Sequence, residues 1–196
     1  MSPHSGTSAQ LSEVRGGNSV AVRFDRPQPR PAKALQYELN VVAADVADTV
    51  TSIGGWLFDR AMAGWRVSVA LDDGADGRAL RILGLKAVGL KALWRPVTAE
   101  SVAMTVIGTS RFESGDHGLA LRDRAGGVVF YGSHAPSGFD APIQRVRYRP
   151  SAAALAFKAH ASAVAGAAAG SVDEVETLFR CGQSADLLDA ELVPVC

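Results

Sequence analysis

An apolar stripe with helical spacing, followed closely by a strand, most constrains the fold of this chain. Six apolar residues spaced three or four apart form the stripe: Val42, Val46, Val50, Ile53, Leu57 and Ala61. This spacing places them on one face of an α-helix, for which Asn40 is a suitable N-cap. Gly54 and Gly55 interrupt that helix at a cost of about 1 kcal/mol each relative to alanine, which indicates close approach of a neighbouring element.

The segments after this helix alternate between strand and helix. Residues 66–71 have the pattern of a strand, and an acidic, glycine-containing turn follows them. A short amphipathic helix ending at Gly84 comes next, and residues 87–90 are a candidate second strand. One continuous helix over residues 78–94 is the alternative, which its glycines disfavour. Helix, strand, turn, helix and strand is the order of a parallel α/β sheet with right-handed crossovers.

The middle of the chain predicts a helix and then a hairpin. Thr98 is a candidate N-cap for a helix through residues 102–107. Two β-prone runs, 119–122 and 128–131, flank a glycine-containing loop. This pattern favours an antiparallel hairpin, and the alternating residues 144–149 are a candidate edge strand.

Two further helices are predicted toward the C-terminus. Ser151 is a candidate N-cap for a long alanine-rich helix, which Gly166 and Gly170 end. Residues 172–179 begin with two acidic side chains, as the dipole of a helix favours, so they predict a shorter helix.

Together these elements predict a single three-layer α/β domain over residues 36–180. Its sheet is expected to be mixed, parallel in its first half, with the hairpin added. Residues 1–35 are rich in Ser, Gly and Pro and alternate Pro with Arg, so we expect a flexible, disordered arm. Residues 181–196 carry weak signals and are expected to be a loosely attached tail.

Charge and composition narrow the classes of function. The 196 residues carry 20 basic and 20 acidic side chains, so the basic excess usual in nucleic-acid-binding proteins is absent. A basic arm and strand keep nucleic acid as a disfavoured partner. No apolar run approaches the roughly 18 residues that cross a bilayer, and the N-terminus lacks a secretory signal. Both cysteines, Cys181 and Cys196, lie in the tail, which favours a reducing cytoplasm. The abundance of Ala, Arg, Gly and Val is typical of GC-rich bacterial genes.

No complete catalytic or cofactor-binding motif is present. Phosphate-binding glycine loops are absent. The segment 108–112 begins like a nucleophile elbow but has Phe112 where the second glycine is required. Ser133 and His134 are neighbours, and neighbours on a strand point to opposite faces, so a strand would not pair them. The four histidines are scattered, so no metal site is predicted, and the sequence leaves the cofactor unknown.

Two acidic features are candidates for a site. Asp72, Asp73 and Asp76 lie in the turn after strand 66–71, where open α/β sheets usually bind ligands. Three carboxylates would repel a phosphate unless a divalent metal bridged them, and a solvated turn is the ordinary explanation. Asp116 and His117 form the only adjacent acidic–imidazole pair, in a glycine-rich loop that is usually a surface feature.

A basic strand is the remaining candidate. Alternation places Arg145, Arg147 and Arg149 on one face of a strand. Three guanidiniums on one face would bind an anion or an acidic partner, whereas an edge strand also uses charge to prevent aggregation. We therefore expect a small cytoplasmic regulatory or accessory protein that binds a protein partner or a small anionic ligand. An enzyme with an acidic, metal-assisted site is the alternative. The alanine-rich helix would serve a homodimer or pack on its own domain.

Overall fold

The part of the chain that can be described lies in one unit. The computed structural model describes residues 36–93, 101–115, 127–167, 173–181 and 193–194. All of them belong to the unit Lys33–Cys196. The predicted arm and most of the predicted tail lie outside the described residues.

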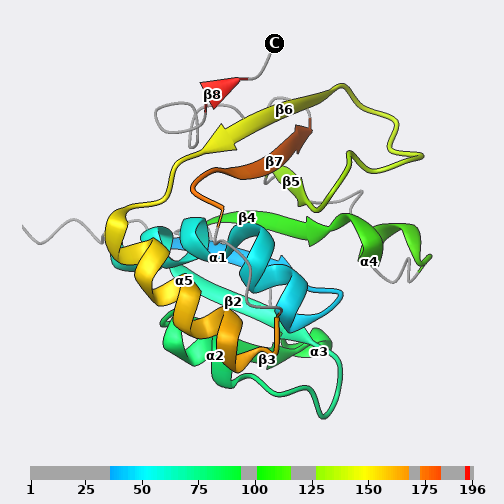
Figure 1. The fold of residues 1–196 in the computed structure, drawn as a ribbon. Coiled ribbons are helices and arrows are strands. Elements are labelled where there is room, and N and C mark those ends of the chain that lie inside the picture. The colour runs from blue at the N-terminus through cyan, green and yellow to red at the C-terminus, as the bar shows by residue number, and fades with distance from the viewer. Residues whose placement is uncertain (1–35, 94–100, 116–126, 168–172, 182–192, 195–196) are drawn as a thin grey trace, which may run out of the picture. The chain divides into compact units, whose positions relative to one another are not determined.

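Eight strands form one mixed sheet (Figure 1). They are β1 (Gln36–Val42), β2 (Arg66–Leu71), β3 (Lys86–Gly89), β4 (Ser101–Gly108), β5 (Val128–Tyr131), β6 (Ile143–Tyr148), β7 (Glu176–Cys181) and β8 (Val193–Pro194). Their order is β3-β2-β1-β4-β5-β7-β6-β8. The first five are parallel, and β7, β6 and β8 continue the sheet by antiparallel pairing. The predicted mixed sheet, parallel in its first half, is confirmed.

Helices cover both faces of the sheet. They are α1 (Val46–Met62), α2 (Arg78–Ile82), α3 (Leu90–Leu93), α4 (Thr109–Glu113) and α5 (Ala152–Val164). α1, α2 and α5 pack side by side on one face, over a core that includes Leu39, Val69 and Trp56 (Figure 1). α3 and α4 cover the other face through a smaller apolar cluster around Ile107 and Phe130. The three-layer arrangement follows from these two cores.

The order in which strands are added to the sheet reverses between β1 and β4. From β1 the chain adds β2 and β3 on one side, and it then adds β4 and β5 on the other side of β1. β1 pairs with β2 on one side and with β4 on the other, so the crossovers before and after this point lie on opposite faces. Such a switch point leaves a crevice at the carboxyl ends of the two strands, where ligands of open α/β sheets usually bind. The fold therefore directs attention to the loops that follow β1 and β4.

The predicted first helix and the element before it need one correction. Asn40 and Val42 belong to β1, and the helix begins only after Asp45, whose side chain accepts hydrogen bonds from the N–H groups of Ala47 and Asp48 at 2.8 and 3.2 Å. The valines before this cap are buried between β2 and β4. β-Branched residues suit such a two-sided position better than a helix.

Two further predicted helices are strands. Residues 102–107 lie in β4, where the β-branched Thr105, Val106 and Ile107 are buried and pair with β1 on one edge and β5 on the other. Residues 176–179 open β7, which is sandwiched between β5 and β6. In both segments pairing on two edges overrides the N-terminal signals, a cap residue in the first and acidic side chains in the second, that favoured a helix.

The remaining predicted elements are placed as follows. The strand 66–71, the short helix before Gly84 and the alanine-rich helix capped by Ser151 are confirmed. The antiparallel partner of β5 is β7, while residues 119–122 lie outside the described residues. β6 is flanked by β7 and, over Val146 and Arg147 alone, by the short β8.

Candidate functional site

The phenol of Tyr131 packs against the carboxyl end of β4, beside the switch point. This side chain is fully buried, and its hydroxyl lies 2.8 Å from the Thr49 Oγ1 on α1. The Thr49 hydroxyl donates its single hydrogen to the carbonyl of Asp45 at 2.7 Å, so Tyr131 is the donor of the first bond. A Cβ at Gly108 would lie 3.1 Å from the Tyr131 hydroxyl, so glycine at the end of β4 makes room for it. Burial raises the pKa of Tyr131 above its usual range.

A polar pocket of about 450 Å³ opens at the carboxyl ends of β4 and β5, and we call it the β4–β5 pocket. It is bounded by the first half of α1, the start of α4, the loop after β5, β6 and the start of β7. The lining residues are Asp48, Thr51, Ser52, Thr109, Ser110, Gly132, Ser133, His134, Arg145, Asp173, Val175, Glu176 and Thr177. Hydroxyl groups and charges of both signs therefore face one cavity.

A serine, a histidine and a carboxylate are joined by hydrogen bonds beside this pocket. The Oγ of Ser133 lies 3.1 Å from the Nδ1 of His134, whose Nε2 lies 3.0 Å from the nearer oxygen of Glu113. The Ser137 N–H also donates to Glu113 at 3.0 Å. These two donors, the Ser137 amide first, lower the pKa of Glu113. We call this arrangement the rim chain.

The loop that holds the rim chain is fixed to the start of α4. Gly132 has a φ of 143°, a conformation that side chains disfavour, and a Cβ there would lie 3.3 Å from the Thr109 side chain. The Thr109 hydroxyl donates to the carbonyl oxygen of His134 at 3.1 Å. Because Ser133 and His134 follow β5 in this bend, the strand geometry that would separate their side chains does not apply.

The arginine row has the predicted alternation. Val146 and Tyr148 are buried, whereas Arg145, Arg147 and Arg149 are exposed. Only Arg145 lines the β4–β5 pocket. Arg149 follows the end of β6 and forms an exposed ion pair with Glu174 at 3.4 Å. The three arginines therefore lie on one face of the strand, as predicted, but their surroundings differ.

The acidic turn after β2 is engaged by arginines. Arg111 donates to both carboxylate oxygens of Asp72 at 3.0 Å, and Arg78 binds Asp76 at 2.7 Å. Asp73 is exposed. A second pocket of about 310 Å³ brings Asp72 and Asp76 close to Asp45. Within the described ranges, no group of three His, Cys, Asp or Glu residues is arranged to hold a metal ion. Asp116 and His117 lie outside the described residues.

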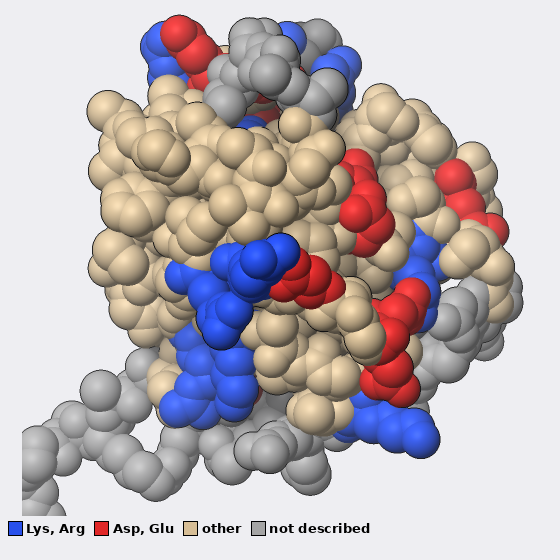
Figure 2. Space-filling model, turned by 60° about the horizontal axis from the view of Figure 1, so that its bottom comes forward, with Lys and Arg blue, Asp and Glu red and all other residues tan. Residues whose placement is uncertain are grey.

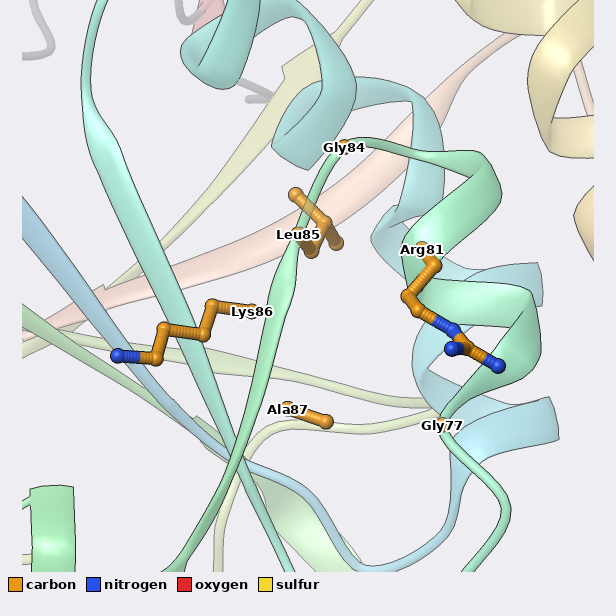
Figure 3. A pocket seen from close by; sticks show the side chains of 6 residues that line it. All are labelled: Gly77, Arg81, Gly84, Leu85, Lys86 and Ala87. Carbon is orange, nitrogen blue, oxygen red and sulfur yellow. The ribbon is translucent and has the colours of Figure 1, made fainter.

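A third pocket lies between α2 and β3 (Figure 3). Its two cations are exposed and do not converge, because the side chains of Arg81 and Lys86 point to opposite sides in Figure 3. Figure 2 shows basic side chains gathered on the face turned toward the viewer, with acidic ones beside them. β3 is the strand at one end of the sheet, and its exposed Lys86 is the kind of charge that usually protects such an edge.

A buried carboxylate cluster joins α1, α5 and β7. The Lys158 Nζ donates to the Oε1 of Glu176 at 2.6 Å, with exposed side-chain fractions of 1% and 0%. The N–H groups of Gly55 and Trp56 donate to the same carboxylate at 2.8 and 2.7 Å. Burial raises the pKa of Glu176, while Lys158 and the two amides oppose that shift. The sequence analysis missed this cluster, although Lys158 is the only charged residue of the alanine-rich helix.

The tail cysteine that can be described is not exposed. Cys181 ends β7 and is buried, and desolvation raises the pKa of its thiol to about 11. Such a thiol is a poor nucleophile at neutral pH. Cys196 lies outside the described residues.

Comparisons with known proteins give no family for this chain. No family model, no curated protein and no solved structure matches it. Within the described residues, no helix combines the length and the apolar character needed to cross a membrane. The candidate site therefore rests on the geometry of the β4–β5 pocket alone.

Proposed function

We propose that this chain binds a small anionic molecule in the β4–β5 pocket, in a regulatory or accessory role. The observation that carries the proposal is Arg145, which is exposed, lines the pocket and makes no ion pair with any described residue. A guanidinium presents a planar fork of donors that matches a carboxylate or phosphate group. An arginine of this kind inside a concave, polar cavity is available to an anion from solution.

The other lining groups restrict the ligand further. Hydroxyls from Ser52, Ser110 and Thr177 can donate to or accept from a polar molecule. Asp48 and Asp173 line the same cavity and would repel a simple dianion. A ligand that combines anionic groups with hydroxyl or ammonium groups matches this mixture of charges best.

The rest of the arginine row supports capture of anions. Arg147 is exposed on the same side of β6 and, like Arg145, makes no ion pair with a described residue. Clustered like charges raise the local concentration of an oppositely charged ligand, an effect that salt weakens. Arg149 contributes less, because Glu174 partly neutralises it.

Thermal unfolding with O-phosphoserine tests this proposal, because that probe carries a phosphate, a carboxylate and an ammonium group. At about 100 times the Kd, a bound ligand stabilises the folded state by about 2.7 kcal/mol, so the wild-type Tm is expected to rise. Arg145→Ala should abolish the rise. Arg149→Ala is the matched control, since it removes an exposed arginine of the same row outside the pocket, and it should keep the response.

Two outcomes would contradict the proposal. A full Tm response in Arg145→Ala would show that the guanidinium does not hold the ligand. No response of the wild type to O-phosphoserine, inorganic phosphate or citrate would reject a small anion as the ligand of this pocket.

A further inference from the structure

The rim chain has the connectivity of a serine nucleophile, a base and a carboxylate that orients the base. Ser133, His134 and Glu113 are linked at 3.1 and 3.0 Å, and all three residues are exposed. Nucleophile–base–orienter chains of this kind are recognised by geometry and by the role of each group. The rim chain lies at the carboxyl ends of β4 and β5, where Ser133 and His134 also line the β4–β5 pocket.

The carboxylate selects the tautomer of His134 that a general base requires. Glu113 is ionised at neutral pH and can only accept hydrogen bonds, so the hydrogen of the neutral imidazole resides on Nε2. Nδ1 then carries a lone pair directed at the Ser133 hydroxyl, 3.1 Å away. The hydroxyl is therefore the donor, and its proton has a defined acceptor.

The surrounding contacts hold this geometry in place before any substrate binds. Glu113 is fixed at the end of α4 by the Ser137 N–H at 3.0 Å. The backbone of His134 is held by the Thr109 hydroxyl at 3.1 Å. Both hydrogen bonds come from residues outside the rim chain, Ser137 and Thr109. They hold the catalytic groups in place before substrate binds, as nucleophilic catalysis requires.

We propose that Ser133 is a nucleophile toward small carboxylic esters, with His134 as its general base and Glu113 as a positioning residue. The Ser133 Oγ forms a bond to the ester carbonyl carbon while its proton passes to His134 Nδ1. The bond from that carbon to the alkoxide oxygen breaks, and His134 returns the proton to the leaving alcohol. Water then gives a proton to the same nitrogen as its oxygen bonds to the acyl carbon; the bond from that carbon to Ser133 Oγ breaks, and the proton passes to Oγ, which leaves a carboxylic acid and free Ser133.

The proposal is independent of the anion assigned to Arg145, since it requires only the rim chain and access to the pocket. The side chain of His134 is 55% exposed, so the reaction proceeds in contact with water. Electrostatic stabilisation is weaker there than in an enclosed site, and slow turnover is expected.

Covalent labelling with an alkyl fluorophosphonate tests the nucleophile directly. The serine oxygen forms a bond to phosphorus, fluoride leaves, and peptide mass spectrometry locates the adduct. We expect the adduct on Ser133 and none at that position in Ser133→Ala. Ser114 is the matched control, because it is an exposed serine at the end of α4 that neither lines the pocket nor belongs to the rim chain; its hydroxyl donates to the carbonyl of Arg111. Ser114→Ala should be labelled at the wild-type rate.

The base and the positioning residue have distinct signatures. General bases contribute about 10²- to 10⁴-fold, so His134→Gln should slow labelling by at least about 100-fold. Glu113→Gln should slow labelling less, and it should weaken the preference of the His134 ring for the Nε2–H tautomer, which ¹⁵N NMR of the ring nitrogens reports. A merely structural role of Glu113 would leave that tautomer preference unchanged.

Each replaced residue is exposed, so every variant is expected to keep the fold. Thermal melts check that slower labelling does not come from unfolding. Equal labelling of Ser133 and Ser114, or wild-type labelling of His134→Gln, would overturn the proposal. Loss of phosphoserine binding in Arg145→Ala with Ser133 labelling intact would separate this activity from the proposed ligand site.

Discussion

Two glutamates at the border of the same pocket have opposite environments. Glu176 lies at 0% side-chain exposure and receives hydrogen bonds from Lys158 and from two amides of α1. Glu113 is exposed and receives hydrogen bonds from His134 and from the Ser137 amide. The first carboxylate joins three elements of the core, whereas the second joins the end of α4 to the loop after β5 at the rim.

The difference shows how one residue type serves stability in one place and chemistry in another. A buried carboxylate costs free energy unless each of its acceptors is used, so the partners of Glu176 are part of the fold. An exposed carboxylate is hydrated in any case, so its bonds contribute little to stability and are free to orient a neighbour. Substitutions should therefore affect unfolding at Glu176 and reactivity at Glu113.

Removal of the buried cation gives the largest expected effect. Lys158→Met leaves Glu176 buried without its counter-charge, and breaking a buried pair in this way costs about 3–5 kcal/mol. Urea denaturation at pH 7 measures the loss in the free energy of unfolding.

The matched control replaces both partners. Lys158→Met with Glu176→Gln removes both charges and should recover part of the loss, because no unpaired charge stays buried. If Lys158→Met unfolded at the same urea concentration as the exposed His134→Gln, the distinction between core and rim would be wrong.

The contact between α1 and the loop before α5 gives the next largest effect. A Cβ at Gly55 would lie 2.7 Å from two atoms of Pro150 and 3.0 Å from the Oε1 of Glu176. Gly55→Ala should therefore cost about 1–3 kcal/mol through overpacking, measured by urea denaturation.

Gly54→Ala is the control in the same helix. Its Cβ would lie 3.3 Å from Leu83 Cδ1, the end of a flexible side chain, and alanine favours a helix by about 1 kcal/mol. The two effects nearly cancel, so little change is expected. If both variants lost the same free energy of unfolding, the close approach of Pro150 and Glu176 would not be the reason why alanine is unfavourable at Gly55.

Local sequence pattern predicts those elements of this fold that pack against the rest of the protein by one face only. The α1 stripe buries one face against the sheet, so its spacing identified the helix, and the glycine pair correctly indicated a close neighbour. β4 and β7 lie inside the sheet, where partners on both edges decide the structure. Such pairing joins residues far apart in the chain, and a local window does not contain that information.

The candidate site is harder to predict for the same reason. Glu113 is separated from His134 by 21 residues, and Glu176 from Gly55 by 121. No spacing rule joins them, because the β4–β5 pairing and the β5–β7 pairing bring them together. Arg145 was predictable as an exposed cation, but not as the member of its row that lines the β4–β5 pocket.

The pH dependence of stability at the rim gives the smallest expected effect. Hydrogen bonds from Ser137 and then from His134 hold the pKa of Glu113 below 4.5 in the folded state. Glu113 therefore stabilises the fold above its unfolded pKa, and this contribution disappears as the pH falls through the lower folded pKa. Urea midpoints measured from pH 6 to pH 3 should fall slightly more steeply in the wild type than in Glu113→Gln. His134→Gln should keep most of the wild-type slope, since the Ser137 amide is the larger cause. Identical slopes in the wild type and Glu113→Gln would show that the two donors do not hold this carboxylate in solution, and the rim chain would lose the anchor of its base.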